Sequence, residues 1–473
     1  MKTKIIATLG PACEAIDTMV NMIHAGVDVF RINLSHQGPE EWRSRVINAR
    51  LAGKRSGRMP ALLFDLQGPK IRTGETSSSG VVLHTGNTII LTSSFSKCNE
   101  GLVFVNYKGL VSDTRCGERI LIDDGKIALQ ITGTEGPDRL VVKVLSGGLL
   151  TSRKGVNFPE TRLNVPALTD ADKENIKLAI ELEIDWLALS FVRSPKDIEE
   201  VRALLQLAGS MNQPGIIAKI EKPEAVDTFS EILNVADAIM IARGDLGVEV
   251  PFERLPIIQK DIIRQCISAA KPVIVATQML EGMMNSLQPT RAEINDIANS
   301  VLDGADTLML SGETATGLHP IESVETMQRV INRIELSGEV NQNRRDALPG
   351  TTERFITDTL IQNATQLATE TSAKAITAYT HTGYTAFRLA AHRPKARIFI
   401  FTDNPWLPSR LKLLWGVEAL FLPKPSKTVD YTEMMRQALT RNRWLDKGDV
   451  VIHLASFPLS AKGKTNMLYL ASV

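Results

Sequence analysis

Residues 215–245 read GIIAKIEKPEAVDTFSEILNVADAIMIARGD. The first part is an apolar run that ends in Lys-Ile-Glu at 219–221, and the last part is an apolar run that ends in Arg-Gly-Asp at 243–245. The residues between them have the apolar spacing of a helix. Short apolar runs that alternate with helices are typical of a parallel sheet covered on both faces. The stretch therefore predicts two parallel strands with charged residues at their carboxyl ends.

The same alternation extends over most of the first 340 residues. Eight strand-like runs occur, at 4–10, 27–35, 61–67, 185–192, 215–221, 238–245, 272–278 and 307–311. Eight strands alternating with helices predict an α/β fold built on a (β/α)8 TIM barrel, whose active site lies at the carboxyl ends of the strands. We assign residues 1–70 and 164–340 to this catalytic barrel.

Residues 71–163 interrupt the alternation and are β-rich, and Asp124-Gly125 between two of their runs is a strong hairpin signal. We expect an inserted small β-barrel domain there, with strands at 81–83, 88–92, 119–122, 127–131 and 140–145. A segment rich in Gly, Asn and Arg at 337–349 precedes a further α/β unit. We assign this C-terminal α/β regulatory domain to 341–473, with strands at 375–379, 397–401, 450–454 and 467–470.

The composition excludes several classes of protein. With 54 basic and 53 acidic residues among 473, the net charge is +1, so no overall field attracts nucleic acid or an anionic membrane. The four cysteines form no CxxC pair, which argues against a disulfide framework or structural zinc and favours a reducing compartment. No apolar stretch approaches the roughly 18 residues of a membrane span. We expect a soluble, cytoplasmic protein in which any anion site is local.

Polar residues follow the second strand. Strand alternation directs Arg31, Asn33 and Ser35 to one face, which in a barrel is the interior or the mouth. Buried polar groups without partners cost about 1 to 3 kcal/mol each, so these side chains meet either a ligand or one another in an internal network. His36 alone is more typical of a histidine that is simply hydrogen-bonded.

Two cations, Lys70 and Arg72, stand where the third strand joins the insert. A cation pair at a domain junction indicates phosphate binding in the cleft between the domains. The alternative is a pair of solvated hinge charges.

The fifth and sixth runs supply a candidate metal site. Lys219 and Glu221 share one face of their strand, and Asp245 ends the adjacent strand. Two carboxylates without a nearby histidine or thiolate select Mg²⁺, or Mn²⁺, over zinc. The alternative is a salt bridge between Lys219 and Glu221. Gly244 permits a tight turn with N–H groups facing an anion, and Thr277 adds a hydroxyl at the end of the seventh strand.

Together these groups predict a phosphoryl-transfer site, where catalysis consists mostly of positioning and charge neutralisation. No Walker A motif is present, since Gly463-Lys464-Thr465 lacks the upstream glycine. Two other classes remain open. A Mg²⁺-dependent barrel lyase or aldolase acting on 2-keto acids leaves the insert, Arg72 and Lys154 unexplained. The other class is a non-catalytic metabolite sensor on the same fold.

The segments at 31–36, 65–74, 219–222, 242–247, 276–281, 289–293 and 309–315 resemble, in this order, the motifs of pyruvate kinase. The resemblance runs from residue 3 to the C-terminus. It implies Mg²⁺-dependent transfer of the phosphoryl group of phosphoenolpyruvate to ADP, which gives pyruvate and ATP in the final step of glycolysis. It also implies a homotetramer.

The resemblance further implies roles for individual residues. The catalytic residues are Lys219, Arg31 and Thr277. Phosphoenolpyruvate binds Arg31, Lys219, Gly244, Asp245 and Thr277, and Glu221 and Asp245 hold Mg²⁺. The nucleotide-binding residues are Asn33, Leu34, Ser35, His36, Arg72 and Lys154, so the insert is a lid on the nucleotide side. The donor of the proton to the enolate stays open.

Potassium-dependent members usually read Asp-Thr-Lys-Gly-Pro-Glu where this chain reads Asp-Leu-Gln-Gly-Pro-Lys at 65–70. Leu66 lacks the threonine oxygen that binds the ion, Gln67 lacks a lysine charge, and Lys70 supplies an internal cation in place of an acid. We therefore expect that K⁺ is not required. The residues retained from the monovalent-cation site are Asn33, Ser35 and Asp65.

In the C-terminal domain, a loop offers hydroxyl and N–H groups to a phosphate through Thr380, Thr382, Gly383 and Thr385. In related enzymes this loop and a glycine-rich loop near 460–465 bind a sugar-phosphate or nucleotide effector. We expect a phosphorylated allosteric effector there. The alternative is that Thr382 or Thr385 caps the following helix.

Overall fold

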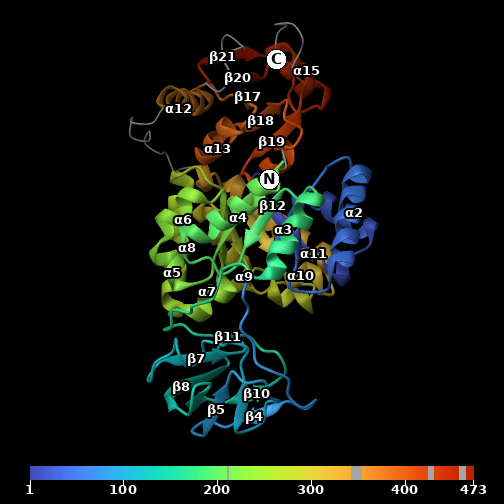
Figure 1. Ribbon diagram of the computed structural model, residues 1–473. Helices are drawn as coiled ribbons and strands as arrows, with labels where there is room; N and C mark the ends of the chain where they lie inside the picture. The colour runs from blue at the N-terminus through green and yellow to red at the C-terminus, as the bar shows by residue number, and fades with distance from the viewer. Residues whose placement is uncertain (210–211, 342–353, 424–430, 457–464) are drawn as a thin grey trace.

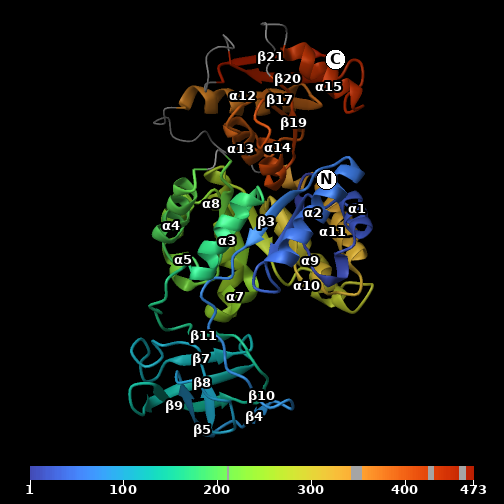
Figure 2. The ribbon, with the colours of Figure 1, turned by 45° about the vertical axis from the view of Figure 1, so that its right-hand side comes forward.

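The computed structural model describes residues 1–209, 212–341, 354–423, 431–456 and 465–473. Three bodies lie in a row, with a β-rich insert at one end, a barrel in the middle and an α/β unit at the other end (Figure 1 and Figure 2). The chain therefore has the predicted α/β architecture, a TIM barrel with an insert and a C-terminal unit.

The barrel is closed by eight parallel strands in the order β1-β16-β15-β14-β13-β12-β3-β2. The strands are β1 (Lys4–Thr8), β2 (Val29–Asn33), β3 (Ala61–Asp65), β12 (Trp186–Leu189), β13 (Gly215–Ile220), β14 (Ala238–Ala242), β15 (Val273–Ala276) and β16 (Thr307–Leu310). All eight predicted strands are confirmed. Each ends before its predicted limit, because polar residues such as Glu221 and Asp245 lie beyond the ladder at the mouth of the barrel.

Helices surround the barrel and pack their apolar faces on it. They are α1 (Ile16–His24), α2 (Pro39–Ser56), α3 (Asp170–Glu181), α4 (Pro195–Leu207), α5 (Pro223–Asp227), α6 (Phe229–Val235), α7 (Arg243–Glu249), α8 (Leu255–Ser268), α9 (Arg291–Asp303), α10 (Gly312–Ala315) and α11 (Pro320–Ser337). Short 3-10 turns are η1 (Pro11–Cys13), η2 (Phe252–Arg254), η3 (Glu281–Met284) and η4 (Glu339–Asn341). Capping fixes the start of α3, since Thr169 Oγ1 accepts the Asp172 N–H at 3.1 Å.

The insert lies between β3 and α3, at the carboxyl ends of the barrel strands (Figure 1). Its strands are β4 (Val81–Leu83), β5 (Thr88–Thr92), β6 (Leu102–Phe104), β7 (Arg119–Ile122), β8 (Ile127–Thr134), β9 (Arg139–Ser146), β10 (Gly148–Leu150) and β11 (Val156–Asn157). Six of them form a sheet in the order β11-β7-β8-β9-β5-β6, and β10 pairs with β4. The predicted hairpin at Asp124-Gly125 joins β7 to β8.

The incoming chain closes the six-stranded sheet into a small barrel. Bridges join Arg72 to Gly155, beside β11, and Thr73 to Val105, beside β6. Backbone hydrogen bonds from Val156 N to Ile71 O (3.0 Å) and from Gly74 N to Phe104 O (2.9 Å) extend the pairing on both sides. The segment at 71–74 is therefore part of the insert's closed sheet.

The C-terminal unit is a five-stranded sheet with helices on its faces. Its elements are α12 (Phe355–Glu370), β17 (Ala375–Tyr379), α13 (Tyr384–Ala391), β18 (Arg397–Thr402), α14 (Leu407–Arg410), η5 (Leu411–Leu413), β19 (Val417–Phe421), α15 (Tyr431–Arg441), β20 (Val450–Ala455) and β21 (Met467–Ser472). The four predicted strands are confirmed, and β19 is an additional strand. The unit contacts the amino ends of the barrel strands, where Thr307 Oγ1 donates to Leu413 O at 2.9 Å.

Among the helices of the described part, none combines the length and apolar character needed to cross a membrane.

Candidate active site

Asp65, at the end of β3, is the centre of a buried ion-pair network. Its Oδ2 lies 2.6 Å from Arg31 Nη2 on β2, and its Oδ1 lies 3.2 Å from Lys219 Nζ on β13. Thr8 Oγ1 on β1 accepts a hydrogen bond from Arg31 Nη1 at 2.9 Å. Ser190 Oγ, just beyond β12, accepts one from Lys219 Nζ at 2.8 Å. Neighbouring barrel strands thus hold both cations in fixed positions at the mouth of the barrel.

Glu221 and Asp245 lie on the same side of the mouth but in different surroundings. The Glu221 side chain is buried, its Oε1 lies 2.8 Å from Lys219 Nζ, and its Oε2 accepts the Phe191 N–H at 2.7 Å. The salt bridge that the sequence offered as an alternative is therefore present. Asp245, in the first turn of α7, is exposed and has no hydrogen bond or ion pair to any other described residue.

The two carboxylates fit a divalent cation. Burial raises the pKa of Glu221, and the negative charge of Asp245 raises it further against the opposing effect of Lys219. A cation bound between them would relieve this repulsion. The described residues contain no group of three or more His, Cys, Asp or Glu side chains that could hold a metal ion. A metal here would therefore take two oxygens from the protein and others from substrate and water, as Mg²⁺ commonly does.

The ion pairs hold Asp65 in its charged form. Burial acts to raise the pKa of the Asp65 carboxyl, but the charges of Lys219 and Arg31 outweigh burial and lower the pKa to about 2. Charge on Lys219 is stabilised in return, because Asp65 and Glu221 outweigh its burial and raise its pKa. Asp65 and Lys219 are consequently both charged at neutral pH.

The low pKa of Asp65 gives a stability prediction. A carboxyl whose pKa is lower in the folded chain stabilises the fold above its unfolded pKa, and this contribution is lost as the pH falls toward the folded value. For a folded pKa of about 2 the contribution is about 2 kcal/mol, lost between about pH 4 and pH 2. We expect the urea midpoint of the wild type to fall more steeply over this range than that of Asp65→Asn. If the urea midpoints of the two proteins fell with pH at the same rate, the low pKa of Asp65 would be contradicted.

Thr277 follows β15 in an unusual backbone conformation. Its φ is 69° and that of Gln278 is 55°, in the left-handed region that β-branched residues avoid. Thr277 Oγ1 accepts the Gly244 N–H at 2.7 Å and donates to Ala276 O at 2.6 Å. The expected tight turn after β14 is wrong, because the residues from Arg243 onward form helix α7. That helix brings Gly244 against Thr277 and orients the hydroxyl.

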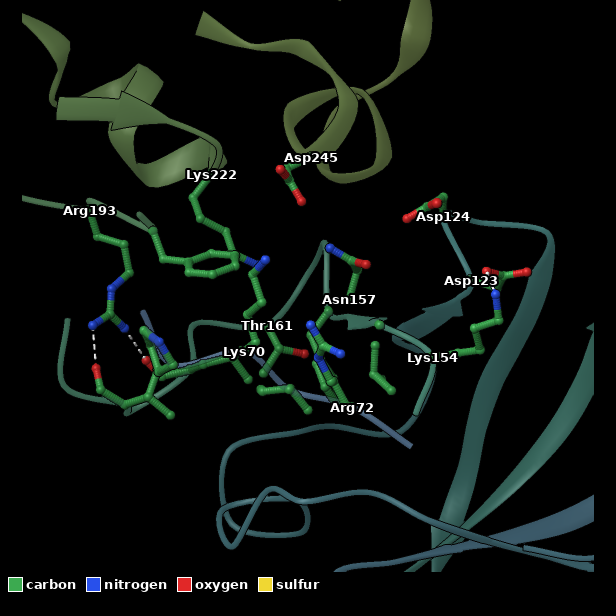
Figure 3. A pocket seen from close by; sticks show the side chains of 18 of the residues that line it. Lys70, Arg72, Asp123, Asp124, Lys154, Asn157, Thr161, Arg193, Lys222 and Asp245 are labelled. Carbon is green, nitrogen blue, oxygen red and sulfur yellow. Dashed lines mark hydrogen bonds and ion pairs between the residues drawn. The ribbon is translucent and has the colours of Figure 1, made fainter. Parts of the chain in front are cut away.

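A cleft with a volume of about 260 Å³ separates the barrel from the insert. Figure 3 shows Asp245 and Lys222 on the barrel side of this cleft, with Arg72 and Lys154 on the insert side. Lys70 lies at the junction and also lines the cleft. Lys154 Nζ is 2.9 Å from Asp123 Oδ1, so one insert cation is partly neutralised. The remaining excess of positive charge suits a phosphorylated ligand.

Of the residues expected to bind nucleotide, Arg72 and Lys154 line this cleft, and His36 lies within electrostatic range of Arg72. Burial lowers the pKa of His36, and the charges of Lys70 and Arg72 lower it further, so the three side chains lie within electrostatic range. The Ser35 N–H donates to Asn33 Oδ1 at 3.1 Å, which fixes the loop after β2. Leu34 was also expected to bind nucleotide, but its side chain packs in the barrel core and does not face the cleft.

Comparison with known proteins decides the family. A model described as "Pyruvate kinase, barrel domain" matches residues 1–324, and one described as "Pyruvate kinase, alpha/beta domain" matches residues 358–471. The chain belongs to the pyruvate kinase family. Members of this family are phosphotransferases, and the chain is an enzyme of that class.

Three relatives named pyruvate kinase illustrate the similarity. The protein of Geobacillus stearothermophilus is 40% identical over 471 residues, which cover 99% of this chain and 79% of that protein. The protein of Corynebacterium efficiens is 40% identical over 99% of this chain and 97% of its own length. That of Mycobacterium tuberculosis is 39% identical over 98% of this chain and 97% of its own length. The similarity thus extends over all three bodies of the fold.

Several residues of the site were not identified from the sequence. Ser190 and Phe191 contribute a hydroxyl and an N–H to Lys219 and Glu221, and Lys222 lines the cleft. Ser190 directly follows the fourth barrel strand, β12, so its place at a strand's carboxyl end is the available signal. Asn157 of the insert also lines the cleft, and nothing in the local sequence marks it.

The candidate effector loop lies between β17 and α13. Gly383 adopts φ 87° and stands before the helix, and its N–H donates to Thr380 Oγ1 at 3.1 Å. Neither Thr382 nor Thr385 caps the helix, which excludes that alternative. Thr382 is exposed, and Thr385 Oγ1 lies 3.1 Å from Thr465 Oγ1. The rest of the expected glycine-rich loop, 460–464, lies outside the described residues.

Proposed function

We propose that the chain transfers the phosphoryl group of phosphoenolpyruvate to ADP, which yields pyruvate and ATP, as the last step of glycolysis. The observation that carries this proposal is the pair of cations Arg31 and Lys219, both bound to Asp65 at the barrel mouth. The phosphoryl-binding charge is fixed before any ligand arrives, which is the requirement for electrostatic catalysis.

The positions of the side chains support the following roles. Arg31 and Lys219 contact the phosphoryl group and neutralise the charge that spreads over its oxygens during transfer. Glu221 and Asp245 would hold Mg²⁺, or Mn²⁺ in its place. A metal ion bound there supplies positive charge to the oxygens of phosphoenolpyruvate. Gly244 and Thr277 bind and orient the substrate carboxylate.

The reaction breaks the bond between phosphorus and the enol oxygen of phosphoenolpyruvate and forms one to a β-phosphate oxygen of ADP. The enolate that leaves takes a proton at its methylene carbon and becomes pyruvate. Thr277, whose hydroxyl is held beside Gly244 at the barrel mouth, assists this step by keeping the enolate in place. The neighbouring carboxylates raise the pKa of Lys219 against the effect of burial, which favours its charged form.

ADP binds on the opposite side, between the insert and the loop after β2. Arg72 and Lys154 provide cations for its phosphates, and Asn33, Ser35 and His36 form the barrel side of that site. The insert then acts as a lid that excludes water from the phosphoryl group.

We also propose that the enzyme needs no K⁺. Lys70 lies within electrostatic range of Asp65, Glu221 and Asp245, although burial and Lys219 lower its pKa. Its ammonium group therefore interacts with Asp65, the carboxylate retained from the monovalent-cation site. Leu66, at the position of the missing threonine oxygen, is buried.

The loop of Thr380, Thr382, Gly383 and Thr385 is our proposed site for a phosphorylated effector. The exposed Thr382 hydroxyl and the loop that Thr380 holds support this role. Such an effector would lower the half-saturating concentration of phosphoenolpyruvate.

The test is a coupled assay of ATP and pyruvate with phosphoenolpyruvate, ADP and Mg²⁺, in a buffer whose only monovalent cation is tetramethylammonium. We expect equal amounts of both products and no change in rate when K⁺ is added. Pyruvate without ATP would contradict phosphoryl transfer to ADP, whereas strong activation by K⁺ would contradict only the role of Lys70.

A further inference from the structure

A side-chain hydrogen bond joins the insert directly to the barrel helix that carries Asp245. Asn157 Nδ2, on β11, donates to Glu249 Oε1, at the end of α7, over 2.6 Å. Figure 3 shows Asn157 at the centre of the cleft, between Asp245 and the insert cations. The bond therefore joins a residue that lines the cleft to a buried carboxylate of the barrel.

On the insert side, Asn157 is fixed to a rigid sheet. It pairs with Leu121 on β7, and its neighbour Val156 pairs with Ile122 and donates to Ile71 O at 3.0 Å. A movement of Asn157 therefore requires a movement of the insert as a whole. The bond to Glu249 forms only when the insert lies close to the barrel.

On the barrel side, Glu249 lies on the same helix as Asp245, one turn away. Residues four apart lie on the same face of a helix, so Glu249 stands one turn below Asp245. The Glu249 side chain is 1% exposed, it is paired with Lys222 Nζ, and its Oε2 has no partner among the described residues. Lys222 in turn follows Glu221 directly in sequence. The helix and the strand that supply the two candidate metal ligands thus meet at the carboxylate of Glu249.

We propose that Glu249 is a positioning residue that couples closure of the insert to the placement of Asp245. Asn157 binds Glu249 when the insert is closed, and this holds α7 and its Asp245 carboxylate against the cleft. When the insert opens, Glu249 keeps only Lys222, and α7 loses its restraint from the insert. The inference rests on the proposed function, because it assigns Asp245 to the metal.

The pair offers a swap test, because donor and acceptor can be exchanged. Asn157→Asp places two carboxylates against each other and removes the donor. Glu249→Gln keeps an acceptor for Asn157 but loses the pairing with Lys222. In the double variant, the amide at position 249 would donate to the carboxylate at position 157. The negative charge would then lie on the insert, within reach of Lys222. Asn87→Asp, in the exposed turn between β4 and β5, is the matched control for an added charge.

Three readouts are needed. Hydrogen exchange of the linkers at 67–70 and 164–168 reports insert opening. Mn²⁺ affinity reports the placement of Asp245, and steady-state kinetics separates KM for ADP from kcat. For Asn157→Asp we expect faster exchange, Mn²⁺ affinity reduced about 10-fold and kcat reduced about 10-fold, as for loss of a group that orients a metal ligand. The double variant should recover most of each loss, since paired residues are not additive. Asn87→Asp should match the wild type.

Additive losses in the double variant would overturn the coupling. Faster exchange with unchanged Mn²⁺ affinity would also overturn it, because the insert would then open without moving Asp245. These outcomes do not depend on turnover. A protein that shows the exchange and Mn²⁺ effects but forms no ATP would instead contradict the proposed function.

Discussion

Replacing Lys219 with methionine is expected to lower kcat by about 1000-fold or more, the usual effect of removing a cation that stabilises a transferring phosphoryl group. Lys219 Nζ is held by Asp65, Glu221 and Ser190, so its position does not depend on the substrate. Methionine keeps the length of the side chain and removes the charge. Steady-state kinetics at saturating phosphoenolpyruvate and ADP measures the effect.

Two measurements separate chemistry from folding in this variant. Breaking a buried ion pair costs about 3 to 5 kcal/mol, so the thermal midpoint of Lys219→Met is also expected to fall. The folded fraction at the assay temperature must therefore be measured by circular dichroism. Lys260→Met is the control, since Lys260 is exposed on α8, where it pairs with Asp303 at the end of α9. Full turnover by a folded Lys219→Met variant would contradict the assigned role.

Asp245→Asn should abolish tight binding of the divalent metal while leaving the fold intact. Loss of a group that merely orients a metal ligand costs 10- to 100-fold in affinity, so loss of one of two carboxylate ligands should cost at least about 100-fold. The fold should survive, because the Asp245 side chain is exposed and makes no hydrogen bond or ion pair with the other described residues. Mn²⁺ titration followed by electron paramagnetic resonance measures the affinity without turnover.

The control for this variant is Asp124→Asn. Asp124 lines the same cleft but belongs to the β7–β8 hairpin of the insert. It should keep the Mn²⁺ affinity of the wild type, which shows that the effect is not a general loss of negative charge in the cleft. Equal losses in the two variants would place the metal elsewhere.

The barrel could be predicted because its strands are continuous apolar runs, as at Gly215–Ile220, where both faces are buried. The additional strands β6, β10 and β11 have only two or three residues, too few for a periodic signal. In strand β19 the half-exposed Glu418 interrupts the apolar run, so the sequence pattern does not indicate a strand there. These strands exist because partners in the folded sheet complete their hydrogen bonds.

The chemistry of the site could be predicted residue by residue, but not its connections. Arg31 and Lys219 were identified at strand ends, whereas the sequence does not show that both pair with Asp65, which lies 34 and 154 residues away. The bond from Asn157 to Glu249 spans 92 residues and depends on how the insert packs on the barrel. Such contacts follow from tertiary structure, so a linear pattern cannot contain them.

The most direct test of the account is phosphorus NMR of one reaction mixture, with phosphoenolpyruvate, ADP, Mg²⁺ and enzyme in a K⁺-free buffer. We predict that the phosphoenolpyruvate signal disappears as the γ-phosphorus signal of ATP grows in equal amount, with no inorganic phosphate formed. Release of inorganic phosphate, or persistence of phosphoenolpyruvate beside an enzyme shown to be folded, would contradict phosphoryl transfer at this site.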